Sequence, residues 1–243
     1  MKDVTFVIQG PANSISISSI DNLLKFGKVV ISCYDTDNLE KYSIPSEVKV
    51  IRNPPATHHP MWHPSKNIQN SFFQAYTTLS GLNHVDTEFA IKMRGDESFE
   101  CFSSFIEKMK QFPEKYTTIN FLFRKDSHFK FHPSDHLFGC KTSILRDAFN
   151  ILFYKNVEIQ NAPIECKIFL SFLQAKGIVA ELNRSKEQMT QNCQIVNLRE
   201  MKEFILSVNC GNDYKSPIKY NSSQIDHIES HESHITVNRM EEI

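Results

Sequence analysis

The sequence has few glycines and none of the glycine-rich loops that cradle phosphates. Only 7 of its 243 residues are glycine, and neither Gly-x-x-x-x-Gly-Lys-Ser/Thr nor Gly-x-Gly-x-x-Gly occurs. Their absence argues against P-loop NTPases and dinucleotide enzymes, which need close backbone approach to a phosphate. The chain also has no Gly-x-Ser-x-Gly elbow, which argues against an α/β-hydrolase.

An excess of one charge is missing as well. Lys and Arg total 27 against 28 Asp and Glu, so the net charge is -1. Nucleic acids and anionic lipid surfaces attract proteins with a basic excess on at least one face. The balance therefore disfavours a protein whose main partner is nucleic acid.

Long apolar runs and paired cysteines are also lacking. The N-terminal apolar run covers residues 4–8, too short for a signal peptide or a membrane span. The six cysteines contain no Cys-x-x-Cys pair, which disfavours a zinc ribbon and a compact disulfide framework. We expect free thiols and a cytoplasmic location. Peripheral membrane attachment through a partner stays open, although no basic amphipathic helix is evident.

The chain alternates between strand and helix patterns. Apolar or β-branched runs closed by turn residues predict strands at 4–9, 29–34, 48–52, 88–94, 117–123, 135–139, 178–182 and 194–198. Apolar residues at three- and four-residue spacing predict helices at 14–26, 65–81, 102–112, 144–153 and 163–176. This order predicts a single α/β domain over residues 1–208, with a mixed, mostly parallel sheet flanked by helices.

The C-terminal residues have a different composition. From residue 209 the apolar density drops and Asn, Ser, His and Glu dominate. We expect residues 209–243 to form a polar tail that is loosely attached or folded over the body. His227, His231 and His234 have a spacing that would suit zinc on a helix, but the composition favours a solvated segment.

The strongest functional signal lies in the predicted strand at 88–94 and the residues after it. Alternation puts Phe89, Ile91 and Met93 on one face, and Ala90, Lys92 and Arg94 on the other. In a central strand, charged side chains need partners, because an unpaired buried charge is costly. They either neutralise one another or line a cleft for an anionic ligand; the alternative is an edge strand with a solvated face. Ligands collect at the carboxyl ends of strands in open α/β sheets, which favours a site.

Asp96 and Glu97 follow this strand. Two carboxylates suit Mg²⁺ or Mn²⁺, hard cations that bind oxygen and leave positions for phosphate and water. Adjacent residues on a strand face apart, so both can coordinate one cation only if the strand has ended at Gly95.

Several segments together resemble one known family. They are the N-terminal Val4-Thr5-Phe6-Val7-Ile8-Gln9-Gly10-Pro11, the helix with Asn70, Gln74, Thr78 and Gly81-Leu82, Lys92-Met93-Arg94-Gly95-Asp96, Asp135-His136-Leu137-Phe138-Gly139 and Pro163-Ile164-Glu165. In order and spacing the chain is similar to the WavE-type lipopolysaccharide and glycan synthesis family over roughly residues 4 to 180. The resemblance implies a GT-A-like, Rossmann-like fold and a metal-assisted glycosyltransferase. Such an enzyme takes a nucleotide-sugar donor and a glycan or lipid-linked acceptor in surface polysaccharide synthesis.

The resemblance places Asp96 where GT-A enzymes keep the metal-binding carboxylate, and we expect the neighbouring Glu97 to assist it. Arg94 stands two positions earlier, where a complete Asp-x-Asp would have its first Asp. Arg94 or Lys92 is therefore an alternative group for neutralising the donor diphosphate.

Other donor-binding candidates lie at predicted strand ends and on one helix. The strand ends contribute Gln9, Gly10, Pro11, Asp35 and Asp37, and the helix contributes Asn70 and Gln74. Asp35 and Asp37 have the acceptor atoms for hydrogen bonds from a ribose or base, although Asp-Thr-Asp is also a common turn composition.

An acceptor hydroxyl must lose its proton, so the site needs a base. Asp135, in a polar segment just before an apolar pair, is the first candidate; the alternative is an Asp that organises a turn. Glu165 is the second, as base or acceptor contact; the alternative is an ordinary first-turn helix glutamate.

Two other functions remain open. A sugar-phosphate nucleotidyltransferase would share the sheet and the carboxylate, but it usually has a Gly-rich basic loop after the first strand, and residues 11–19 contain no cation. A degenerate transferase would bind nucleotide-sugar or glycan without turnover.

Overall fold

A seven-stranded sheet forms the centre of the computed structural model, with strand order β3-β2-β1-β4-β7-β6-β8. The structure describes residues 3–59, 66–121, 123–124, 126, 129–154, 162–206, 209–210, 213–214 and 218–221. The strands of this sheet are β1 Val4–Gln9, β2 Lys28–Tyr34, β3 Lys49–Asn53, β4 Phe89–Arg94, β6 Tyr116–Ile119, β7 Leu137–Lys141 and β8 Cys193–Val196. Strand β7 runs antiparallel to both neighbours, and the other pairings are parallel.

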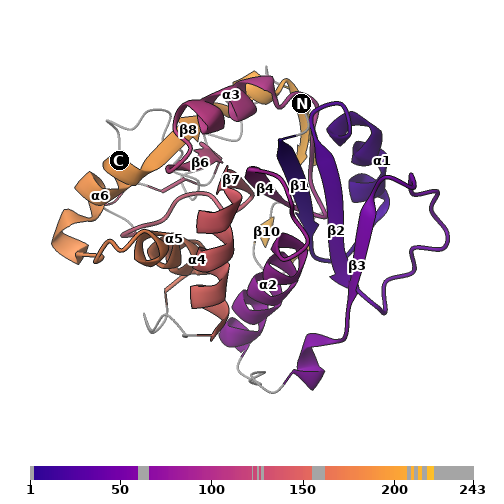
Figure 1. Ribbon diagram of the computed structural model, residues 1–243, viewed down its shortest axis with the longest axis horizontal. Coiled ribbons are helices and arrows are strands. Elements are labelled where there is room, and N and C mark those ends of the chain that lie inside the picture. The colour runs from indigo at the N-terminus through magenta and orange to yellow at the C-terminus, as the bar shows by residue number, and fades with distance from the viewer. Residues whose placement is uncertain are drawn as a thin grey trace.

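Helices cover both faces of the sheet (Figure 1). The helices are α1 Ser14–Leu23, α2 Lys66–Leu82, α3 Ser103–Gln111, α4 Thr142–Tyr154, α5 Ile164–Ala175 and α6 Ser185–Asn192, and short 3₁₀ turns occupy Ala56–His58, Leu182–Arg184 and Leu198–Met201. Apolar residues of α1 and α3 pack on one face of the sheet, and those of α2, α4 and α5 pack on the other. The expected α/β class, with a mixed, mostly parallel sheet flanked by helices, is confirmed.

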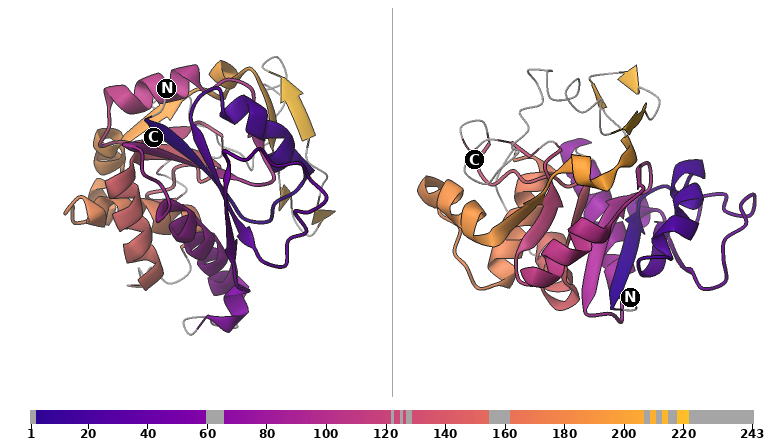
Figure 2. Two further views of the ribbon diagram at one scale, coloured as in Figure 1. Left: turned by 45° about the vertical axis from the view of Figure 1, so that its right-hand side comes forward. Right: turned by 90° about the horizontal axis from the view of Figure 1, so that it is seen from above.

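A second, three-stranded sheet has the order β12-β9-β5 and lies outside the sequence-based expectations. It joins β5 Ser98–Phe99, β9 Glu203–Leu206 and β12 Ile218–Asn221, and a separate pair is formed by β10 Asn209–Cys210 and β11 Asp213–Tyr214. The right-hand view of Figure 2 shows the yellow C-terminal strands above the body of the domain. Strand β12, from the expected polar tail, therefore pairs with a strand of the body. His227, His231 and His234 lie outside the described residues.

The strand expected at 178–182 is wrong. Gly177 follows α5 with φ +73°, and the chain then continues into the 3₁₀ turn and α6, which leads to the edge strand β8. Val179 and Leu182 are 78% and 62% exposed, and both line an apolar cavity of about 570 Å³ beside α5. The apolar residues of 178–182 therefore line a cavity at the surface and do not form a strand of the buried sheet. No helix in the described part of the chain is long and apolar enough to cross a membrane.

Gly139 on β7 has no room for a side chain. A Cβ placed there would lie 2.7 Å from the Ala90 carbonyl oxygen and 2.9 Å from the Met109 sulfur. We expect Gly139→Ala to lower the free energy of unfolding by about 1–3 kcal/mol, because the core must shift to admit the methyl group. Urea unfolding measures the effect. Val179→Ala, at an exposed position, is the control and should change stability by less than about 0.5 kcal/mol; equal stability of the two variants would contradict the prediction.

Candidate active site

Strand β4 is central, between β1 and β7, and this excludes the alternative of an edge strand with a solvated face. Phe89, Ile91 and Met93 pack in the core on one side, as alternation predicted. Lys92 points to the other side and is completely buried. Its ammonium donates a 2.7 Å hydrogen bond to the Asp135 carbonyl oxygen and lies 5.3 Å from the centre of the Phe138 ring.

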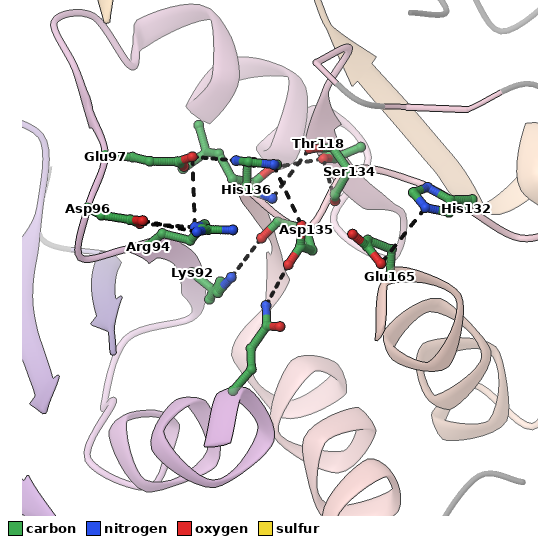
Figure 3. A network of polar contacts seen from close by, with 12 residues as sticks. Lys92, Arg94, Asp96, Glu97, Thr118, His132, Ser134, Asp135, His136 and Glu165 are labelled. Carbon is green, nitrogen blue, oxygen red and sulfur yellow. Dashed lines mark hydrogen bonds and ion pairs between the residues drawn. The ribbon is translucent and has the colours of Figure 1, made fainter. Parts of the chain in front are cut away.

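The reversed direction of β7 brings distant polar residues to the end of β4. Met93 pairs with Leu137, so the residues just before β7 lie beside the last residues of β4. Thr118 Oγ1 of β6 lies within hydrogen-bond distance of two carbonyl oxygens, 3.0 Å from Ser134 and 2.8 Å from Leu137. Asp135 and His136 are thereby held at the edge where the parallel strands end (Figure 3).

Burial lowers the pKa of Lys92 to about 8, and the charge of Asp135 partly offsets that shift. Lys92 thus remains mostly protonated at neutral pH. Because Lys92 has no exposed surface, it cannot contact a ligand directly. It hydrogen-bonds to the Asp135 backbone and contributes a buried positive charge next to the site.

Arg94, the last residue of β4, forms a two-point ion pair with Asp96. Its Nε and Nη2 donate to the two carboxylate oxygens of Asp96, both at 3.0 Å, and Nε also lies 3.8 Å from Glu97 Oε1. Burial alone would lower the pKa of Arg94, but the carboxylates of Glu97 and Asp96 outweigh it and raise that pKa above its ordinary value. Arg94 is therefore a permanent cation at this edge of the sheet.

Glu97 is completely buried and accepts a hydrogen bond from His136 Nδ1 through Oε1. Its second oxygen, Oε2, has no hydrogen-bond partner among the described residues. The strand ends at Arg94, as the metal hypothesis requires. Nevertheless, Asp96 is already bound to the Arg94 guanidinium, and the Glu97 oxygen 3.8 Å from that guanidinium is hydrogen-bonded to His136. In the described ranges, no group of three or more His, Cys, Asp or Glu is placed to hold a metal ion. The donor set does not fit a divalent cation.

Asp135 has a buried carboxylate, 5% exposed, that accepts a 2.7 Å hydrogen bond from Gln74 Nε2 of α2. Burial acts to raise its pKa, but the positive charge of Lys92, with smaller effects from His136 and Arg94, outweighs burial and holds the pKa of Asp135 below its ordinary value. Asp135 is thus an anion throughout the physiological pH range.

Glu165 has the opposite character. It lies in the first turn of α5, its side chain is 22% exposed, and its Oε2 is 3.8 Å from His132 Nε2. Burial, reinforced by the negative charge of Asp135, raises the pKa of Glu165 to about 7. Burial and the nearby charge of Arg124 lower the pKa of His132 to about 4, so this imidazole is neutral at pH 7. Two carboxylates whose pKa values are pushed apart are typical of paired acid–base sites.

The donor-side candidates lie at the ends of β1 and β2. Gly95 approaches the β1 end so closely that a Cβ would lie 2.7 Å from the Pro11 carbonyl oxygen. Gln9 donates a 3.0 Å hydrogen bond to Thr77 Oγ1 of α2, Gly10 has φ +98°, and Asp35 is exposed. Asn70 lies on α2, but its side chain is outside the described part of the structure.

Asp37 organises the turn after β2. One carboxylate oxygen accepts from the backbone N–H groups of Tyr34 at 3.1 Å and Ala12 at 3.3 Å. We expect Asp37→Ala to lower the free energy of unfolding by about 1–2 kcal/mol, because two backbone donors lose their acceptor. Asp37→Asn retains an acceptor oxygen and should recover most of that loss in thermal unfolding. If nucleotide affinity fell equally in both variants, the result would instead show that the negative charge of Asp37 is needed to bind the nucleotide-sugar.

His136 is the site residue that sequence reasoning left unassigned. It stands beside Asp135, contacts Glu97 through Nδ1, and places Nε2 3.9 Å from Asp135 Oδ1. Its position next to a candidate base was the available signal, but its partner Glu97 is 39 positions away.

Comparisons with known proteins give distant structural likenesses and one sequence family. No curated protein sequence matches the chain. The crystal structure of S. aureus TarS is similar at 13% identity and a TM-score of 0.42, over 70% of this chain and 34% of the TarS chain. HddC from Yersinia pseudotuberculosis, complexed with GMP-PN, is similar at 12% identity and a TM-score of 0.38, over 60% of this chain and 80% of HddC.

This chain thus spans about a third of the TarS chain, and at such TM-scores neither likeness bears on function. The sequence family gives the firmer result and confirms the resemblance seen in the motifs. Residues 4–212 match the family model described as WavE lipopolysaccharide synthesis, and the chain belongs to that family.

Proposed function

We propose that this protein is a GT-A-like glycosyltransferase that moves a sugar from a nucleotide-sugar to a glycan or lipid-linked acceptor. The observation that carries the proposal is the pair Asp135 and Glu165. The first carboxylate is held ionised by Lys92, with smaller contributions from His136 and Arg94, and the second has a pKa of about 7. Membership of a lipopolysaccharide synthesis family supports sugar transfer as the reaction class.

In the proposed reaction the acceptor hydroxyl oxygen bonds to the anomeric carbon of the donor sugar. The bond from that carbon to the diphosphate oxygen breaks, and the diphosphate leaves with the electron pair. Glu165 takes the hydroxyl proton, because it is partly exposed and its pKa of about 7 matches that task at neutral pH. Asp135 is the weaker base of the two, since it is almost completely buried and its pKa is lowered.

The donor diphosphate is proposed to lie near the end of β4, with the nucleoside toward the ends of β1 and β2. Gln9, Gly10 and Pro11 adjoin Gly95, so the two strand ends form one continuous edge. The exposed Asp35 has free access to a ribose or base at that edge.

Differential scanning fluorimetry against nucleoside diphosphates and nucleotide-sugars tests the proposal, because a ligand that binds the folded state raises its melting temperature. A positive nucleotide is then followed by an assay for nucleoside diphosphate release. Binding without hydrolysis or transfer would identify a degenerate binding protein. Release of pyrophosphate from a nucleoside triphosphate mixed with a sugar 1-phosphate would identify a nucleotidyltransferase. Absence of any shift across the panel would contradict the proposal.

A further inference from the structure

The carboxylates expected to hold Mg²⁺ or Mn²⁺ are already paired with a cation of the chain itself. Figure 3 shows the Arg94 guanidinium facing the carboxylates of both Asp96 and Glu97. Two N–H groups of Arg94 bond to Asp96, and Glu97 Oε1 is 3.8 Å from Nε. A divalent ion at this point would have to displace the guanidinium, or sit against a positive charge a few ångströms away.

The arrangement leaves part of Arg94 available to a ligand. Its Nη1 makes no hydrogen bond to any described residue, and the side chain is 27% exposed. Guanidinium presents five N–H donors in a plane, so binding Asp96 with one edge leaves donors for phosphate oxygens on another. Lys92 lies behind it, buried and mostly protonated, and adds positive charge without contacting the ligand.

From this geometry we infer that Arg94 takes the place of the divalent cation, so that the donor diphosphate binds without a metal ion. The inference rests on the proposed function, since it assigns the group that neutralises the donor of that reaction. Asp96 is then a positioning residue, which fixes the guanidinium by its two-point contact, and Glu97 holds His136 and Arg94 from the buried side.

The experiment compares nucleotide affinity with and without metal. The probes are UDP, GDP and CDP, each measured by isothermal titration calorimetry in EDTA and in Mg²⁺ or Mn²⁺. We expect the dissociation constant of the nucleotide that binds to change by less than about threefold between these conditions, a difference below 1 kcal/mol. Arg94→Ala should weaken binding by about 10- to 100-fold in EDTA.

Arg94→Asp provides a gain-of-function test, because it places a second carboxylate two residues before Asp96. In the absence of nucleotide, Mn²⁺ should raise the melting temperature of this variant and leave that of the wild type unchanged. Arg94→Asn, which has the same shape without the charge, is the matched control and should not respond to Mn²⁺.

The outcomes separate this inference from the proposed function. Nucleotide binding by the wild type that disappears in EDTA, or a wild-type melting temperature that Mn²⁺ raises as much as that of Arg94→Asp, would overturn the role of Arg94 and leave a metal-dependent transferase. Failure of every nucleotide to bind in all conditions would overturn the proposed function instead. In either case, the metal response of the nucleotide-free variants shows whether Arg94 keeps a divalent cation out of this position.

Discussion

Glu165→Gln is expected to lower the rate of sugar transfer by about 10²- to 10⁴-fold, the usual contribution of a general base. The amide keeps the size of the side chain but cannot accept the hydroxyl proton. Nucleotide affinity should be nearly unchanged, because Glu165 lies on α5, toward His132 and away from the Arg94 end of the site (Figure 3). Steady-state kinetics with a fixed donor, together with calorimetric nucleotide binding, separates the two effects.

The pH dependence of the wild type gives an independent check on this base. Glu165 is protonated below its pKa of about 7 and can accept a proton only above it. The value of kcat/KM should therefore rise with pH through about 7 and level off above it. Asp135, His132, His136 and Arg124 surround this carboxyl group, and of these Asp135 reinforces burial in raising its pKa. A profile that is flat from pH 5 to 8 would remove Glu165 from the base role.

Asp135→Asn is expected to shift the acidic limb of that profile rather than to abolish transfer. Removing the negative charge of Asp135 lowers the pKa of Glu165, because that charge is second only to burial among the causes of its elevation. We expect the limb to move by about one pH unit toward acid, a typical effect of one nearby charge. The hydrogen bond from Gln74 Nε2 should survive in this variant, because the amide oxygen of Asn can accept it in place of the carboxylate oxygen.

This variant also decides between the two candidate bases. Loss of transfer at every pH, with nucleotide binding intact, would make Asp135 the base, as the sequence pattern first suggested. Asp147→Asn is the matched control, because Asp147 is an exposed residue of α4 that no part of the proposed reaction uses. Its pH profile should coincide with that of the wild type.

Much of the fold follows from local patterns in the sequence. The runs that became β1, β2 and β4 and the face that each side chain of β4 occupies could be predicted, because alternation and burial are local properties. Helix α6 could not, because Ser185, Gln188, Met189 and Asn192 bury a mostly polar face. Residues 178–182 were expected to form a buried strand because they are largely apolar, but several of them are exposed. Burial depends on what packs against a segment, which its own sequence does not reveal.

The sequence indicates the residue types of the candidate site but not the pairings between them. Lys92, Arg94 and Asp96 were identified from the strand pattern, and Asp135 and Glu165 from their polar settings. The contact of Glu97 with His136 depends on β7 running antiparallel to β4, and no periodicity reveals strand direction. The separation of the Asp135 and Glu165 pKa values likewise arises from burial and from Lys92, which only the folded chain brings together.

The close approach of Gly95 to Pro11 limits how the proposed nucleotide-sugar specificity of this protein could be altered by mutation. The backbones after β1 and β4 are in close contact, so the spacing between the proposed nucleoside and phosphate positions is set by the main chain and not by side chains. Lengthening the loop after β1 or the loop after β4 would separate the proposed nucleoside and phosphate positions and misalign both. New specificity is therefore best sought by exchanging exposed side chains such as Asp35, with the loop lengths left as they are.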